Sequence, residues 1–314
     1  MSGNQHSQTY DQGPTDFDWF LGLQKSRVRR DKERASFFFG NFRSSSTKTL
    51  TGARRKYQRT TASTSRPKCV MLKPPMNRAR FLFYGELNDF LPPVRRGTPV
   101  EQGFNSHPTV KHLIESLGVP HPEVDRILAN GLPAGFDYRV QDGDWMDVYP
   151  APEDGSPPVA PMPEPRFVLD NHLGRLAAYL RMLGFDALYR NDYEDDELAE
   201  TAEREDRILL TRDRRLLMRK AVRYGYCLRS LDPKRQVEEV LRRFRLLNQI
   251  HPFRRCLHCN GLLEPVAKAA VLDQLEPLTR RYFDKFHRCA SCSRVYWRGS
   301  HYQRMRKLVE TILK

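Results

Sequence analysis

Hydrophobic and polar positions follow a strand-like pattern in some parts of the chain and a helical pattern in others. Residues 80–84 form an apolar run typical of a strand, and residues 87–91 are expected to continue it as a hairpin. Residues 109–117 have apolar side chains at helical spacing, preceded by a threonine that can cap the first turn. A turn signal at residues 130–131 leads towards a last strand over residues 145–149.

This order of strands around one helix, in residues 77–150, is typical of a small α+β domain of β-grasp type. The segment is similar to ubiquitin-like and sulfur-carrier domains. It ends in Val148, Tyr149 and Pro150 rather than in a free Gly-Gly tail, so a thiocarboxylate carrier or a conjugated modifier is not expected. We expect an accessory domain that is passive or contacts RNA.

Strands and helices alternate in residues 166–250, which predicts an α/β domain with a parallel sheet and helices on both faces. The carboxyl ends of the strands of such a sheet form a rim where ligands bind. The strands are expected over residues 167–169, 187–189, 208–211 and 226–228.

Carboxylates follow three of these strands: Asp170 the first, Asp195 and Asp196 the second, and Asp213 the third. The predicted topology brings them to one rim, where like charges repel unless cations compensate. Oxygen ligands of this kind suit Mg²⁺ or Mn²⁺, and such an ion can activate water for attack on a phosphodiester. Each carboxylate after the second or third strand also has a structural explanation, because it can cap the helix that follows.

Four of the six cysteines form two Cys-x-x-Cys pairs near the C-terminus. Cys256 and Cys259 make the first pair, and Cys289 and Cys292 make the second, with 29 residues between the pairs. Four thiolates at this spacing predict a tetrahedral structural Zn²⁺ site, with iron or redox-active thiols as the alternatives. The segment between the pairs is long for a zinc ribbon, so a helix is expected over residues 271–283.

Cations and aromatic residues surround the cysteine pairs. Such a mixture can bind phosphates and stack on unpaired bases. Tyr296 and Trp297 have an alternative role as the core of a small zinc ribbon. The cations that we expect to contact RNA are Arg255, Arg294, Arg298 and His301.

Composition indicates that part of the chain lacks a core. Hydrophobic residues make up 39% of the 314 residues, below the about 45–50% usual for a globular domain. Residues 1–76 are polar and are predicted to be a disordered basic tail, whereas residues 151–165 contain six prolines and are predicted to be a linker. Two explanations of the tail stay open: an RNA-binding extension, or a start codon assigned upstream of Met71 or Met76.

Charge is distributed unevenly along the chain. The total is +15, of which residues 1–76 carry +10, residues 77–250 carry −3 and residues 251–314 carry +8. A basic chain usually binds nucleic acid or another anionic surface, but a flexible tail can produce the same balance without function. The contrast between the acidic middle and the basic C-terminal segment is therefore the better argument for RNA binding.

Three segments together resemble the RNase domain of the Mut-seven-C (Mut7-C) family. Residues 167–186 begin Phe-Val-Leu-Asp-Asn-His, and residues 195–202 and 207–213 complete the resemblance, the last reading Arg-Ile-Leu-Leu-Thr-Arg-Asp. The family belongs to the PIN-like nucleases, and its RNase domain is often preceded by a ubiquitin-like domain, which residues 77–150 resemble. The end of the second cysteine pair, up to His301, also resembles the end of the family's domain.

The resemblance implies a PIN-like nuclease core in residues 166–250 and a zinc ribbon in residues 251–314. It places Asp170, Asp195 or its neighbour Asp196, and Asp213 at acidic positions of the metal-dependent site. PIN-like nucleases commonly use four acids, and three positions are matched here.

These features predict an enzyme, a ribonuclease that hydrolyses RNA phosphodiesters with Mg²⁺ or Mn²⁺ while a structural zinc ribbon aids RNA binding. The alternative is an RNA-binding or adaptor protein that keeps the fold without cleavage. A protein partner bound through the ubiquitin-like domain is a third hypothesis. No apolar run approaches the about 20 residues that cross a bilayer, and the N-terminus lacks the layout of a secretory signal, so we expect a cytoplasmic protein without a membrane partner.

Overall fold

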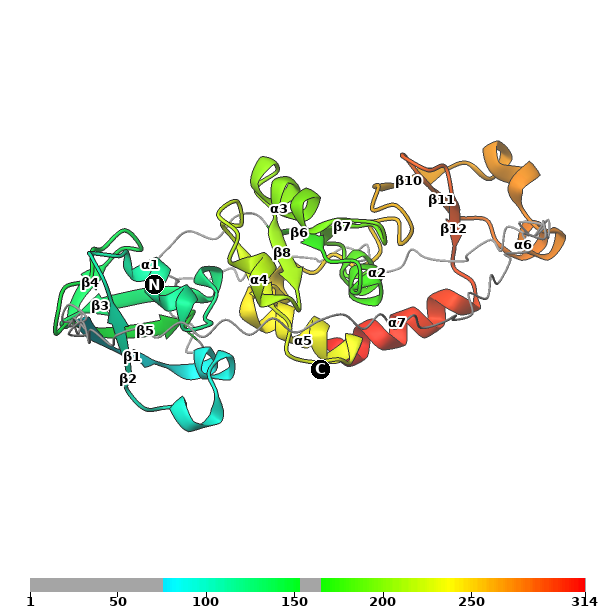
Figure 1. Ribbon diagram of the computed structural model, residues 1–314. Helices are drawn as coiled ribbons and strands as arrows, with labels where there is room; N and C mark the ends of the chain where they lie inside the picture. Colours follow the sequence, from blue (N-terminus) through cyan, green and yellow to red (C-terminus); the bar gives the residue numbers. More distant parts are fainter. Residues whose placement is uncertain (1–75, 153–164, 314) are drawn as a thin grey trace, which may run out of the picture. The chain divides into compact units, whose positions relative to one another are not determined.

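The computed structural model describes residues 76–152 and 165–313. The predicted tail, except Met76, and most of the predicted linker lie outside these residues. The described residues contain a mixed sheet, a parallel sheet and a small antiparallel sheet (Figure 1). We refer to residues 76–152 as the mixed-sheet domain, residues 165–250 as the parallel-sheet domain and residues 251–313 as the cysteine module.

The mixed-sheet domain has five strands and the helix α1 (Val110–Ser116). The hydroxyl of Thr109 caps this helix by accepting a hydrogen bond of 3.3 Å from the backbone N–H of His112, as predicted. β1 and β5 pair in parallel, and the other neighbours pair antiparallel. In the order in which they pair, the strands are β2 (Val100–Phe104), β1 (Asn77–Phe83), β5 (Trp145–Pro150), β3 (Val124–Ala129) and β4 (Leu132–Ala134).

The prediction of a strand over residues 87–91 is wrong. These residues lie mostly in the 3-10 helix η2 (Gly85–Phe90), and the strand that pairs with β1 comes later, at β2. The Asn88 side chain donates to the carbonyl oxygens of Phe83 (2.8 Å) and Gly85 (3.2 Å), which holds the chain in a turn directly after β1.

The parallel-sheet domain contains four strands, all parallel to their neighbours, as predicted. Leu169 and Leu210 pack with side chains of α2 and α5, whereas Val168 and Leu209 pack with side chains of α3 and α4. Helices therefore cover both faces, because successive residues of a strand point to opposite sides. The strands across the sheet are β7 (Asp186–Tyr189), β6 (Arg166–Leu169), β8 (Ile208–Thr211) and β9 (Gly225–Cys227), and the helices are α2 (Gly174–Met182), α3 (Asp195–Arg204), α4 (Arg214–Leu217) and α5 (Pro233–Arg243).

The cysteine module contains an antiparallel sheet of β10 (Leu263–Val266), β11 (Phe286–Cys289) and β12 (Val295–Trp297). The single helix predicted over residues 271–283 is instead two short helices, η6 (Lys268–Gln274) and α6 (Pro277–Tyr282), because the proline that begins α6 prevents a continuous helix. Tyr296 and Trp297 are buried, so they belong to the core of the module. The last helix, α7 (Ser300–Ile312), packs Tyr302 and Val309 into the core on the α2 and α5 side of the parallel sheet.

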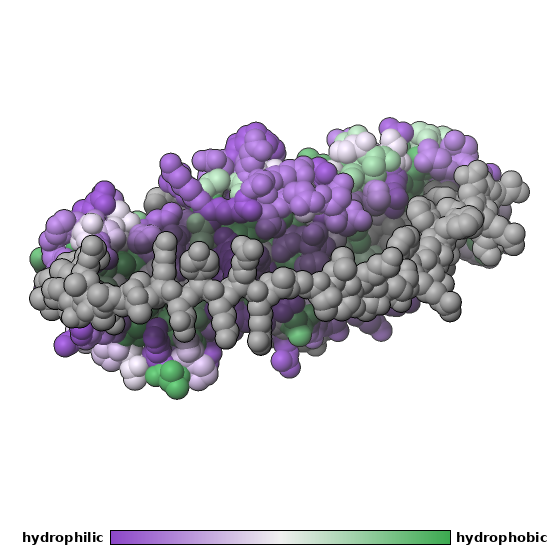
Figure 2. Space-filling view, in the orientation of Figure 1, coloured by the Kyte–Doolittle hydropathy of each residue, from purple (hydrophilic) through white to green (hydrophobic). Residues whose placement is uncertain are grey.

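Hydrophobic surface is limited on the face of the molecule shown in Figure 2. Where described residues are visible, hydrophilic side chains dominate and hydrophobic ones form small separate patches. Among the described residues, no helix combines the length and the apolar character needed to cross a membrane.

The mixed-sheet domain contacts β9, an edge strand of the parallel sheet. Glu123 is fully buried, and its carboxylate accepts hydrogen bonds from Arg229 (3.1 and 3.2 Å) and from the backbone N–H of Cys227 (2.6 Å). Burial raises the pKa of Glu123, and the guanidinium of Arg229 opposes that rise. Nearby, Arg214 donates to the carbonyl oxygen of Phe90 at 3.0 Å. One hydrophobic cluster runs from the mixed sheet to the α3 face of the parallel sheet, so the two domains share a buried junction.

We expect Glu123→Ala to lower the free energy of unfolding by about 3 kcal/mol, because it removes the carboxylate that is hydrogen-bonded to the mostly buried guanidinium of Arg229 and leaves only the more distant Asp89. Glu101→Ala, which removes an exposed ion pair with Arg78, is the control and costs less than about 1 kcal/mol. Urea unfolding followed by circular dichroism measures both values. Equal losses in the two variants would contradict the role given to Glu123.

Candidate functional site

The rim formed by the carboxyl ends of β6 and β8 holds two of the predicted acids. Asp170 directly follows β6, and Asp213 lies two residues after Thr211, the last residue of β8. The buried hydroxyl of Thr211 donates to Asp170 Oδ2 (2.7 Å) and accepts from the backbone N–H of Asp213 (2.9 Å). Thr211 therefore fixes both acidic residues relative to each other.

Each of these two carboxylates is positioned through one oxygen. Asp213 Oδ1 accepts a hydrogen bond of 2.8 Å from the backbone N–H of Arg215 and caps α4, so the structural explanation for Asp213 is correct. The second oxygens, Asp170 Oδ1 and Asp213 Oδ2, accept no hydrogen bond from any residue in the described ranges. Two carboxylates are the chemical kind of donor set that binds Mg²⁺, an ion commonly held through one or two carboxylates while it keeps several of its waters.

The other two predicted acids lie in the first turn of α3 and are held by a cation. Arg219 forms an ion pair with Asp195 (Nη2 to Oδ2, 3.7 Å) and a closer one with Asp196. Glu194, not either aspartate, occupies the N-cap position of α3. Within residues 76–152 and 165–313, the acids of the rim do not form a set of three ligand atoms within 4.8 Å of one another. The rim therefore consists of Asp170 and Asp213, whereas Asp195 and Asp196 of α3 form ion pairs with Arg219.

The four cysteines, in contrast, lie close enough together to bind one metal ion. Their Sγ atoms all lie within 4.8 Å of one another, with Cys259 to Cys289 at 3.4 Å and Cys256 to Cys292 at 3.6 Å. Sulfurs about 2.3 Å from a tetrahedral zinc ion are about 3.8 Å apart, so the set has nearly the size that zinc requires. The four-cysteine cluster is thus consistent with a structural Zn²⁺ site.

Tyr296 and Gly261 both lie against the cysteine sulfurs. The Tyr296 hydroxyl lies 2.8 Å from Cys256 Sγ, and burial, together with this contact, raises the pKa of Tyr296, so the phenol stays protonated and donates to the sulfur. Burial raises the pKa of Cys256, but the Tyr296 hydroxyl and backbone N–H groups outweigh it and favour the thiolate. At Gly261, a Cβ atom would lie 2.9 Å from Cys289 Sγ, so a side chain would crowd the ligands.

The first cysteine pair is fastened to the parallel sheet by Asp186, the first residue of β7. Asp186 Oδ1 accepts hydrogen bonds from Arg207 (2.7 Å) and from Asn260 (2.8 Å). Burial alone would raise the pKa of Asp186, but these two hydrogen bonds lower it below its ordinary value. Arg181 adds two hydrogen bonds from the sheet side, to the carbonyl oxygens of Leu257 (3.1 Å) and His258 (2.9 Å).

The predicted RNA-binding cations occupy different environments. Arg255 has a side chain that is 19% exposed, and it pairs with Asp186 Oδ2 at 3.3 Å, so it supports the same joint. Arg294 and His301 are exposed, and Arg298 is half-buried. The roles of Asp186, Arg181 and Asn260 were not predicted from the sequence. The sequence offered one indication of a role for Asp186, which is that it is the last residue of the family-like segment 167–186.

Comparisons with known proteins divide the chain at the same place as the fold. The Mut7-C RNAse domain matches residues 165–309, and the Mut7-C ubiquitin domain matches residues 76–155. The solution structure of the Haloferax volcanii HVO 2177 protein is 19% identical and covers 24% of this chain and 83% of its own, with a TM-score of 0.20 that carries no structural argument. The comparison with curated proteins gave no match.

We expect the purified chain to contain one zinc ion per molecule, and Cys289→Ser to lose it because a tetrahedral site needs all four thiolates. Cys227→Ala is the control, since Cys227 is buried in β9 and is not part of the four-cysteine cluster. Metal analysis by mass spectrometry measures the stoichiometry. A Cys289→Ser protein with a full complement of zinc would refute the assignment of this ligand.

Tyr296→Phe is expected to weaken zinc binding by about tenfold, because it removes a hydrogen bond to a ligand sulfur. The matched control is Tyr282→Phe, at an exposed tyrosine of the same module. Competition with a chromogenic chelator reports the affinity. If both variants release zinc like the unaltered chain, the hydroxyl has no influence on the metal site.

Proposed function

The chain has a Mut7-C RNAse domain preceded by a Mut7-C ubiquitin domain, and on that premise we propose that it is a metal-dependent ribonuclease acting at the rim of Asp170 and Asp213. The family implies an RNA substrate. The observation that carries the rest of the proposal is the unit of Asp170, Thr211 and Asp213, in which one hydroxyl positions two acidic residues.

In metal-assisted hydrolysis of a phosphodiester, the main tasks of the protein are to bind the metal ion and to position it against the RNA. A bound Mg²⁺ or Mn²⁺ would supply an activated water and stabilise the leaving oxygen of the phosphodiester. Asp170 and Asp213 would hold the ion through the oxygens that accept no hydrogen bond from a described residue. The Thr211 hydroxyl holds the Asp170 carboxylate and the backbone of Asp213, and the backbone N–H of Arg215 holds the Asp213 carboxylate. Carboxylates held in place before the substrate binds can lower the activation barrier of hydrolysis, and no covalent nucleophile is needed.

The cysteine module would serve the same reaction by binding the RNA strand. Its exposed side chains Arg294 and His301 can donate hydrogen bonds to phosphates on the surface of the module. Arg255 is a weaker candidate because Asp186 already neutralises it. We therefore assign RNA contact to Arg294, Arg298 and His301 ahead of Arg255.

A second function, RNA binding without cleavage, has one observation in its favour. Arg219 neutralises Asp195 and Asp196, the acids that would complete the metal site. If this ion pair persists on RNA, two carboxylates alone face the substrate. RNA affinity with no metal-dependent cleavage under any tested condition would favour this second function.

We expect Asp170→Asn and Asp213→Asn each to reduce Mg²⁺-dependent cleavage of RNA by at least about 100-fold, or about 2.7 kcal/mol of transition-state stabilisation. The control is Asp206→Asn, because Asp206 is exposed in the same domain and has a backbone φ of 50° that asparagine also adopts. Purified zinc-loaded protein is assayed on single-stranded and on structured RNA. Undiminished cleavage by both rim variants would refute the proposed site.

A further inference from the structure

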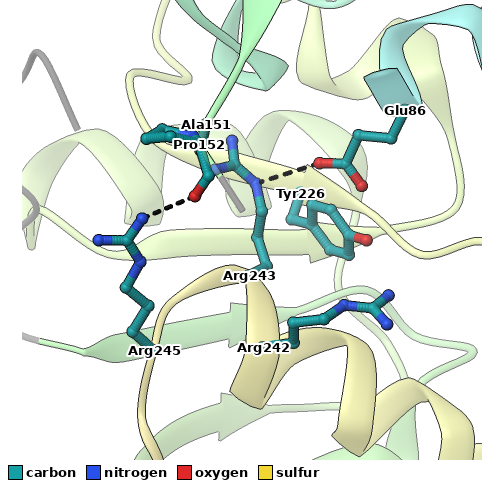
Figure 3. A pocket seen from close by; sticks show the side chains of 7 residues that line it. All are labelled: Glu86, Ala151, Pro152, Tyr226, Arg242, Arg243 and Arg245. Atoms are coloured by element: carbon teal, nitrogen blue, oxygen red, sulfur yellow. Dashed lines mark hydrogen bonds and ion pairs between the residues drawn. The ribbon is translucent and has the colours of Figure 1, made fainter. Parts of the chain in front are cut away.

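A cavity of about 310 Å³ lies away from the acidic rim, where the end of α5 meets η2 and residues 151–152 (Figure 3). We call it the arginine pocket. Its walls come from four parts of the sequence that the fold brings together. The lining residues are Glu86, Ala151, Pro152, Tyr226, Arg242, Arg243 and Arg245.

Arg243 occupies an unusual position in this pocket. Its side chain is only 10% exposed, and its Nε atom is buried without a hydrogen bond. Its guanidinium donates no hydrogen bond to any other residue that the structure describes, and the Glu86 carboxylate stands off at 3.8 Å. The buried Nε–H of Arg243 has no acceptor, and burying a donor in this way is unfavourable. An oxygen of an anion bound in the pocket would supply the missing acceptor.

The contacts around Arg243 hold its guanidinium in place without using its donors. The rings of Tyr226 and Phe244 lie 5.9 and 5.8 Å from the guanidinium carbon. Next to Arg243, Arg245 Nη2 donates to the carbonyl oxygen of Pro152 at 2.6 Å. In Figure 3, Arg243 lies between this carbonyl and Glu86, so Arg243 and Arg245 point into the same space.

The charge of the pocket favours an anion. Among the lining residues, Arg242, Arg243 and Arg245 outnumber the carboxylate of Glu86, and outside the lining the buried carboxylate of Glu123 also interacts with Arg243. Guanidinium groups bind phosphate oxygens through paired N–H donors, a geometry that lysine cannot offer. A volume of about 310 Å³ is at the lower end of small-ligand sites, and admits a phosphate group with a sugar or base attached.

We propose that the arginine pocket binds a phosphate group, with Arg243 as the principal ligand and Arg245 as the second. The phosphate belongs either to the backbone of a bound RNA strand or to a free nucleotide. The RNA source rests on the proposed function, whereas phosphate binding by the pocket does not. Glu86 then tunes the affinity by repelling the anion.

The test begins with phosphate binding by the zinc-loaded full chain in a buffer without phosphate. Inorganic phosphate and adenosine monophosphate are expected to raise the melting temperature of the unaltered chain by a few degrees, because they bind the folded state. Arg243→Met is expected to abolish that rise and to weaken nucleotide binding, measured by calorimetry, by at least about tenfold. Arg235→Met, at an exposed arginine of the same helix, is the matched control and keeps the rise.

Glu86→Gln separates a phosphate site from an ion pair that serves only stability. If the pocket binds phosphate, this variant binds adenosine monophosphate more tightly than the unaltered chain. If Arg243 is present only to pair with Glu86, both Glu86→Gln and Arg243→Met melt at lower temperature, and phosphate shifts neither. The second pattern, or an unaltered chain that does not respond to phosphate, overturns the proposal.

RNA binding distinguishes the two sources of the phosphate. The measurement uses a fluorescent single-stranded RNA and Asp170→Asn protein, so that the strand stays intact. If Arg243→Met weakens RNA binding and adenosine monophosphate competes with RNA, the phosphate is part of the strand. If Arg243→Met abolishes nucleotide binding but leaves RNA binding unchanged, the ligand is a free nucleotide. Loss of cleavage in the rim variants has no bearing on either result, so the two proposals fail separately.

Discussion

The mostly buried carboxylate of Asp186 is the constraint on which the rest of the structure depends. An ionised carboxylate in this position is stable only with partners, and those partners come from different parts of the chain: Arg207 precedes β8, and Asn260 follows the first cysteine pair. The backbone of Asn260 has a φ of 71°, a left-handed conformation that asparagine tolerates better than most residues. The parallel sheet and the first cysteine pair therefore share one hydrogen-bonded joint, so a metal bound by the cysteines would also stabilise the sheet.

The acidic rim illustrates how one residue can serve structure and chemistry together. Asp213 caps α4 through one oxygen, and this same hydrogen bond holds the other oxygen in a fixed direction. Thr211 does the equivalent for Asp170. A helix cap and a metal ligand are thus compatible uses of one carboxylate, so the structural explanation does not compete with the catalytic one. For Asp195 and Asp196, in contrast, the structural contact competes with metal binding, because the ion pairs with Arg219 neutralise the negative charge that a metal ion would need.

Much of the fold could be predicted from the sequence because its signals are local. Apolar runs predicted the strands that end at Leu169 and Thr211, and the two Cys-x-x-Cys pairs predicted the four-cysteine cluster. The failures have equally specific causes. Asn88 turns the chain through hydrogen bonds to the backbone of the preceding strand, and a proline divides the helix expected over residues 271–283. The ion pair of Arg219 with the α3 acids joins residues more than twenty positions apart, and no spacing rule reveals such a partner.

The contact between Glu123 and Cys227 has a consequence for how the domains can be separated. β9 is an edge strand of the parallel sheet, and the Glu123 carboxylate accepts a hydrogen bond from one of its backbone N–H groups. An uncovered strand of this kind is a template for pairing with another chain. The mixed-sheet domain therefore covers part of this edge of the parallel sheet. An RNAse domain separated from its ubiquitin-like partner would expose that edge, so the joining of the two domains in one polypeptide also keeps the edge covered.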